Sequence, residues 1–371
     1  MKNRTTFLLI TAITLIGTQF SLSAQKKDSP FTLGAHYVGD LVSNFDGGLK
    51  TGTSYLGMAT IEAGFSTENA DWWKGGEAFA KIANTHGGEP TADLVGDFQG
   101  VSNIEAGNMT WLYELWYKQN IGPVSITAGL QDLNVNFAAS EYGALFTNSS
   151  FGVHSSIADN IPAPIFPLTA LGLNMEWQIS DKYLLKAAIF DGTPDEFENN
   201  PFNINWKLCK TDGFLVVSEF QIDKSIIKNK NGCYKLGIYF HEHSDINVGV
   251  EKNKGFYFVG DQQITDKLSA FSQIGLSPKN INVHNHFYGI GVNYNGLIKK
   301  RPNDQCGIAV AHAGFDENTT GNETAIEMTY KFHLLPNIYI RPDIQYIINP
   351  AGTATKLDNA LVGFVRLDIS L

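Results

Sequence analysis

Cysteine is scarce in this chain and follows no recognisable pattern. The 371 residues contain three thiols, at Cys209, Cys233 and Cys306. An odd number of cysteines does not define a disulfide framework, and without a Cys-x-x-Cys pair no zinc site is indicated. The strand positions given below predict Cys209 at one end of the fold and the other two near the opposite end. That separation is too long for a disulfide from Cys209 to either.

Positive charge and long apolar runs are also lacking. The net charge is −10, and an acidic chain has no evident use for nucleic acid. Beyond the first residues no apolar run approaches about 18 residues, so no transmembrane helix is expected. Neither a Gly-x-Ser-x-Gly elbow nor a Walker-type phosphate loop occurs. The sequence therefore predicts no enzyme and no cofactor.

The N-terminus has the features of an export signal. Lys2 and Arg4 precede an apolar run at 7–20, and small residues follow it. This arrangement predicts a signal peptide over residues 1–24 and one mature domain over 25–371. The alternative, a membrane anchor helix, is disfavoured because the run is short and interrupted by threonines.

Hydrophobic alternation with a period of two dominates the rest of the chain. In the final ALVGFVRLDISL, leucine, valine and isoleucine occupy one face, whereas Arg366 and Asp368 share the other. The same alternation recurs through 168–179, 324–334 and 337–347. A period of two is the signal of a strand.

Counting such runs predicts about sixteen strands. They lie near 31–41, 54–66, 77–84, 109–119, 123–131, 168–179, 183–190, 214–222, 233–242, 255–260, 268–275, 286–296, 306–313, 324–334, 337–347 and 360–371. The composition, with 36 glycines and 24 phenylalanines, suits an all-β protein.

The links between these strands alternate in length. Short links such as NIGP and SDK alternate with long ones near 85–108, 132–167, 191–213 and 243–254. Short turns at one end and long loops at the other predict a transmembrane antiparallel β-barrel with periplasmic turns and extracellular loops. Lipid outside and water inside explain the two faces of the last strand. In a soluble β-sandwich, short and long links need not fall at opposite ends of the strands. A β-solenoid would show a fixed sequence repeat, and none is found.

Several stretches resemble the carbohydrate-selective porins of the OprB type. The most specific are YIRPDIQYIINPAG, with a proline–acid–x–Gln–Tyr core, and DNALVGFVRLDI, with a Gly-x-x-Arg strand. The resemblance implies a sixteen-stranded bacterial outer-membrane channel that passes glucose and related monosaccharides or small oligosaccharides. It also implies that the loop at 132–167 folds into the barrel and narrows the pore. The chain ends in Leu371, where the family usually carries an aromatic residue.

A sugar channel needs polar side chains that bond hydroxyls weakly and aromatic rings that face the sugar ring. Candidates on the polar face of their strands form the predicted lumen path. These are Arg341, Asp343, Gln345, Arg366, Glu327, Glu114, Trp116 and Lys118. Pro342 lacks a ladder donor, so it should face lipid and direct Arg341 and Asp343 inward.

Two functional alternatives to a sugar porin remain open at this point. The first is a general diffusion porin without sugar selectivity, and the second is a barrel enzyme. HEH at 241–243 and HNH at 284–286 could each place two histidines on one strand face, as a metal requires, but both fall near loop ends and predict no metal site. The expected partners are small sugars and outer-membrane lipid, with homo-oligomerisation left open.

Overall fold

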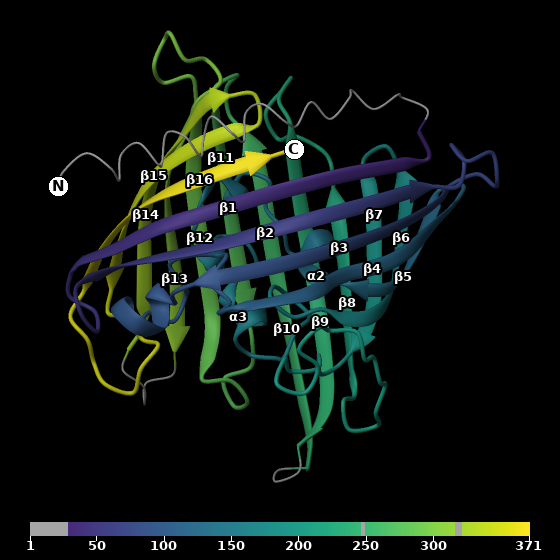
Figure 1. The fold of residues 1–371 in the computed structure, drawn as a ribbon, viewed down its shortest axis with the longest axis horizontal. Helices are drawn as coiled ribbons and strands as arrows, with labels where there is room; N and C mark the ends of the chain where they lie inside the picture. Colours follow the sequence, from purple (N-terminus) through teal and green to yellow (C-terminus); the bar gives the residue numbers. More distant parts are fainter. Residues whose placement is uncertain (1–28, 246–248, 316–320) are drawn as a thin grey trace, which may run out of the picture.

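The protein folds into a closed barrel of sixteen antiparallel strands (Figure 1). The computed structural model describes residues 29–245, 249–315 and 321–371. Each strand pairs with its sequence neighbours, and β1 closes the barrel against β16. The bounds are β1 Phe31–Asp46, β2 Gly52–Ser66, β3 Gly76–Gly87, β4 Met109–Ile121, β5 Val124–Gln131, β6 Ala170–Ser180, β7 Tyr183–Asp191, β8 Phe214–Ile222, β9 Gly232–Asp245, β10 Gly249–Gln263, β11 Leu268–Leu276, β12 His284–Asn295, β13 Gln305–Phe315, β14 Glu323–Leu335, β15 Ile338–Ile348 and β16 Ala360–Ser370. The predicted fold class is confirmed.

The two faces of β16 lie as the alternation predicted. Val365 points outward and is 47% exposed, whereas Arg366 points inward and is 5% exposed. The Arg366 guanidinium donates two hydrogen bonds of 2.7 Å to the carboxylate of Asp40 on β1. The apolar outer face suits lipid, and this ion pair keeps both charges inside the barrel.

Pro342 and a β-bulge adjust the ladder at two places that matter for the site. Along β14 and β15, Thr329 pairs with Asp343 and Phe332 with Ile340, with an interruption opposite Pro342. This gap follows from the missing proline N–H. Between β3 and β4, Lys81 pairs with Glu114 but Ile82 pairs with Leu112, so Tyr113 forms a bulge. A bulge re-aims side chains, and Tyr113 is buried.

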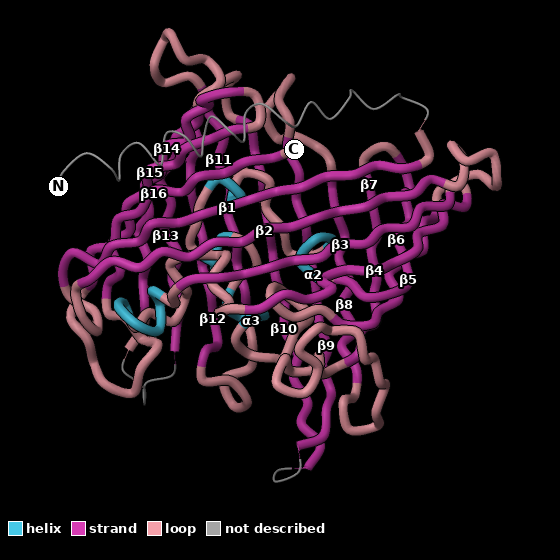
Figure 2. Tube along the Cα trace, in the orientation of Figure 1, coloured by secondary structure: helices cyan, strands magenta, loops and turns pink. Residues whose placement is uncertain are grey.

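The strands end in short turns at one end of the barrel and longer loops at the other (Figure 2). Cys233 and Cys306 lie near the short-turn end and Cys209 in the loop 192–213, all three as free thiols. The expected long loop at 243–254 is wrong, because β9 and β10 continue through most of it and only 246–248 lie outside the described residues. Cross-strand pairs such as Glu242–Lys252, at 3.0 Å, hold this extension.

The predicted signal peptide lies outside the described residues, so its cleavage stays a prediction. Among the described residues, no helix is long and apolar enough to cross a membrane. The helices are single turns within two loops: η1 Thr91–Val95 in the loop 88–108, and α2 Leu133–Asn136, η2 Gly143–Leu145, η3 Ser149–Phe151 and α3 Ser155–Ala158 in the loop 132–169. We call these loops loop 2 and loop 3.

Candidate functional site

Loop 3 crosses the inside of the barrel and bonds to the inner wall of many strands. Lys186 on β7 donates to the carbonyl of Asn136 at 2.7 Å, and Glu219 on β8 accepts from the backbone N–H of Ala138 at 2.9 Å. Further along, Asp261 on β10 accepts from the Ser140 hydroxyl at 2.6 Å. The predicted inward folding of this loop is therefore what the structure shows, and its effect on conductance stays a prediction.

Glu327 on β14 holds the middle of loop 3. Its carboxylate accepts from the backbone N–H groups of Thr147 at 2.6 Å and Asn148 at 3.0 Å, and from the Thr147 hydroxyl at 3.0 Å. Gln345 bonds to Asn148 at 3.2 Å and donates to the carbonyl of Val101 in loop 2 at 2.9 Å. Both Glu327 and Gln345 are 0% exposed, so the loops seal them from the lumen.

The other predicted residues on this side lie in the same covered region. Arg341 donates to the carbonyl of Leu145 at 2.8 Å, and Asp343 is buried beside it on the inner face of β15. The Asp40 partner of Arg366 accepts from the Ser102 hydroxyl of loop 2 at 2.7 Å. These five residues form what we call the sealed wall: Glu327, Arg341, Asp343, Gln345 and Arg366. A contact between them and sugar would require the loops to move, so their role in the sugar path stays a prediction.

Apolar packing reinforces this seal. Phe146 and Phe151 of loop 3 are buried against Phe271 of β11, with ring centroids 5.6 and 5.8 Å away. Phe287, Ala309 and Ala311 of the inner wall belong to the same cluster. The hydrophobic alternation places these strand residues inside the barrel. The phenylalanines that cover them lie in a loop, where the sequence shows no such alternation.

The inner face of β2–β4 stays open nearer the short turns. Lys81 pairs with Glu62 at 2.9 Å, and both side chains are part-exposed. Phe79 and Trp116 stack across the two strands, with ring centroids 4.9 Å apart. Trp116 and Lys118 are half-buried, and Glu114, opposite Lys81 in the register, is more deeply buried. We call this surface the open wall: Glu62, Phe79, Lys81, Glu114, Trp116 and Lys118.

The bulge at Tyr113 joins the open wall to the start of loop 3. The Tyr113 hydroxyl donates to Asp132, and the other Asp132 oxygen accepts from the N–H of Asn134 at 2.7 Å, which caps α2. Burial raises the pKa of Asp132 to about 6. The Lys81 ammonium lies 5.7 Å from the centre of the Tyr113 ring. The alternation in the sequence contains no signal for this bulge.

A cavity of about 410 Å³ separates loop 2 from loop 3. Glu105 of loop 2 and Asp159 of loop 3 line it, together with Asn103, Asn134 and Phe166. Burial raises the pKa of Glu105 to about 7, against the effect of its bonds from Thr91. Desolvation inside the barrel, and then the charge of Glu323, raise the pKa of Asp159 to about 7, although the side chain remains exposed in the cavity. The sequence reasoning missed both carboxylates, because neither lies on a strand.

Histidines do not build a metal site in the described part of the chain. His241 and His243 lie near each other on β9, but the His241 ring bonds to the carbonyl of Gly192 at 2.6 Å. No group of three or more His, Cys, Asp or Glu side chains among the described residues could hold a metal ion.

Comparison with known proteins identifies relatives along most of the chain. The family described as carbohydrate-selective porin, OprB family, matches residues 50–371. Porin B of Pseudomonas aeruginosa is 23% identical, over 89% of this chain and 85% of its own length. The putative porin QuiX of Acinetobacter baylyi is 21% identical, over 93% and 90%. The high-pH structure of Pseudomonas putida OprB superposes with a TM-score of 0.82 at 21% identity, over 92% of this chain and 94% of that one.

Proposed function

The chain belongs to the OprB family of carbohydrate-selective porins, and on this premise we propose that sugar passes between loops 2 and 3 and along the open wall. The protein is an outer-membrane channel for small sugars rather than an enzyme. What we propose beyond this is the route of the sugar through the barrel. The expected substrates of the channel are monosaccharides such as glucose. Export through a signal peptide ending at residue 24 belongs to the same proposal, and the mass of protein purified from outer membranes tests it.

The stacked rings of Phe79 and Trp116 beside charged side chains carry the proposal. A hexose presents an apolar ring face and a rim of hydroxyls that both donate and accept. Trp116 offers a flat apolar surface, while Lys81 and Lys118 offer donors and Glu62 an acceptor. All four are part-exposed, so contacts with sugar remain weak enough for release.

Liposome swelling with solutes of matched size tests this route. Trp116→Ala should lower the flux of a hexose relative to a polyol of equal size by a factor of several, because only the hexose loses a stacking surface. Trp177→Ala is the matched control, since Trp177 points to lipid on β6 and is 42% exposed. An unchanged hexose-to-polyol ratio in a folded Trp116→Ala barrel would place the sugar route elsewhere. A wild-type barrel that sorts solutes by size alone would indicate a general diffusion porin.

A further inference from the structure

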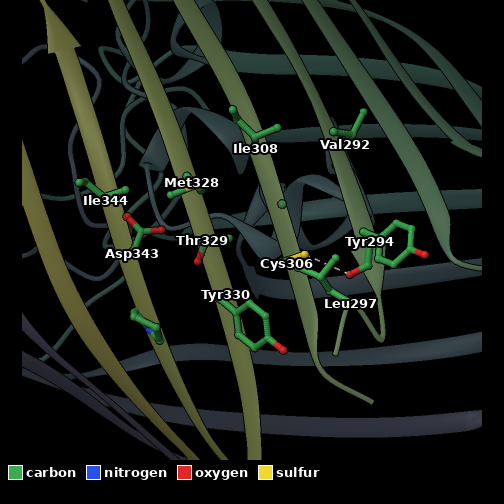
Figure 3. A pocket seen from close by; sticks show the side chains of 12 residues that line it. Val292, Tyr294, Leu297, Cys306, Ile308, Met328, Thr329, Tyr330, Asp343 and Ile344 are labelled. Atoms are coloured by element: carbon green, nitrogen blue, oxygen red, sulfur yellow. Dashed lines mark hydrogen bonds between the residues drawn. The ribbon is translucent and has the colours of Figure 1, made fainter. Parts of the chain in front are cut away.

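A hollow of about 560 Å³ opens on the lipid-facing surface of β12–β15 (Figure 3). The register explains it. Cys306 pairs with Tyr294 on one side and Tyr330 on the other, and all three point outward. The small Cys306 side chain between the two tyrosine rings leaves a gap on the outer surface. The compact Pro342 ring on β15 extends this gap.

Aliphatic side chains continue the hollow toward the middle of the membrane. Val292, Ile308, Met328 and Ile344 are register partners across the four strands. Each of them is exposed on the outer surface, from 38% for Val292 to 58% for Met328. The hollow is thus bounded by flexible apolar groups on its membrane side and by tyrosines on its turn side. Tyrosines favour the boundary between hydrocarbon and water.

Cations lie at the turn end of the hollow. Leu297 lines it, and Lys299 and Lys300 follow in the β12–β13 turn, with Lys299 Cα at most about 7.6 Å from Leu297 Cα. Both lysines are exposed, and neither pairs with a carboxylate in the described part of the chain. The protein has a net charge of −10, so these two adjacent lysines form a local positive patch beside the apolar hollow.

Arg301 fixes this turn against the neighbouring strand. Its guanidinium pairs with Asp304, donates to the carbonyl of His333 at 2.8 Å and lies 5.3 Å from the centre of the Phe332 ring. Asp304 also accepts from the Tyr330 hydroxyl at 3.0 Å. The turn therefore stays beside β14, at the end of the hollow, while its two lysines remain free.

We propose that this surface binds an anionic glycerophospholipid from the periplasmic leaflet. One acyl chain lies in the hollow over Cys306, and the phosphate lies beside Lys299 and Lys300. The short turns mark the periplasmic end of the barrel, where the head groups of that leaflet lie. Charge complementarity selects the head group, because lysines near a membrane surface attract anionic lipids.

Native mass spectrometry of the purified barrel in a neutral detergent tests the proposal. The probes are phosphatidylglycerol and phosphatidylcholine with identical acyl chains. We expect the wild type to retain phosphatidylglycerol at least about tenfold more tightly. The double variant Lys299→Gln/Lys300→Gln should lose this preference and keep its weaker binding of phosphatidylcholine. Cys306→Phe, which fills the hollow, should lose the retention of both lipids.

Matched variants separate this site from general effects. Lys224→Gln/Lys228→Gln removes the same charge from the β8–β9 turn, and Ala128→Phe adds the same ring to an exposed outer position on β5. Both should retain phosphatidylglycerol like the wild type. Equal retention of the two lipids by the wild type would overturn the proposal. So would a loss of preference in the Lys224/Lys228 variant as large as that in the Lys299/Lys300 variant.

Discussion

Glu327→Ala should loosen the middle of loop 3. The substitution removes the acceptor for two buried backbone N–H groups, those of Thr147 and Asn148, and for the Thr147 hydroxyl. A buried donor left without a partner costs about 1–3 kcal/mol, so the two backbone groups together disfavour the docked segment by about 2–6 kcal/mol.

Apolar packing sets the limit of this effect. Burial of a phenylalanine contributes about 1.5–3 kcal/mol, and Phe146 and Phe151 stay packed in the variant. We therefore expect residues 147–150 to loosen while the rest of loop 3 stays inside the barrel. A cysteine placed at Ser150, which is 2% exposed, in a background without native cysteines reports this directly. Its labelling by a water-soluble maleimide should accelerate tenfold or more, and single-channel conductance should rise modestly.

Two comparisons make this test decisive. Met328→Ala, at the next position but on the lipid face, should change neither labelling nor conductance. Glu327→Gln keeps one acceptor oxygen, so it should fall between the wild type and the alanine variant. If Glu327→Ala gives wild-type labelling in an intact barrel, the carboxylate does not hold the loop and the energetic reasoning fails.

Further outcomes follow from the same contacts. Glu105 and Asp159 ionise as the pH rises through about 7. The preference of the channel for cations over anions, measured as a reversal potential, should therefore rise between pH 5 and pH 8. In the Glu105→Gln/Asp159→Asn variant this preference should not change with pH. Because these two pKa values are raised by folding, the stability they contribute is present near pH 4 and is lost as the pH rises through 7. Arg366→Ala leaves Asp40 buried without its partner and should lower the free energy of unfolding in liposomes by about 3–5 kcal/mol; a loss within error would contradict a buried pair. Arg341→Ala removes a bond to loop 3 and should change hexose and polyol flux in parallel, whereas a change in their ratio would support direct sugar contact.

The strands could be predicted because the barrel has two different solvents. Lipid outside and side chains or water inside impose a period of two, and this placed the outer face of β16 and the inward direction of Arg341. The prediction failed at 243–254, where β9 and β10 extend past the predicted strand ends. There Glu242 and Lys252 pair across the hairpin, and the apolar alternation disappears although the ladder continues.

The candidate site was predictable only in part, for a physical reason. Alternation places Glu327 and Gln345 inside the barrel, but it contains no information about what covers them. Their partners are backbone groups of Thr147, Asn148 and Val101, roughly 180 to 240 positions away along the chain. Nearly every residue carries a backbone N–H and a backbone carbonyl, so no side-chain pattern marks the groups that dock.

The division of the barrel into two walls constrains where selectivity can arise. The inner wall of β11–β13 carries Phe271, Phe287, Ala309 and Ala311, which would be exposed to water if loop 3 left the barrel. This apolar surface favours the docked loop, and the sealed wall holds that loop in place. On the route proposed above, the docked loop sets the width of the passage. On the same route, we expect discrimination between solutes of equal size to depend on the open wall, which includes Trp116. The proposal therefore predicts that width and recognition depend on different strands, so that substitutions in one wall leave the property of the other unchanged.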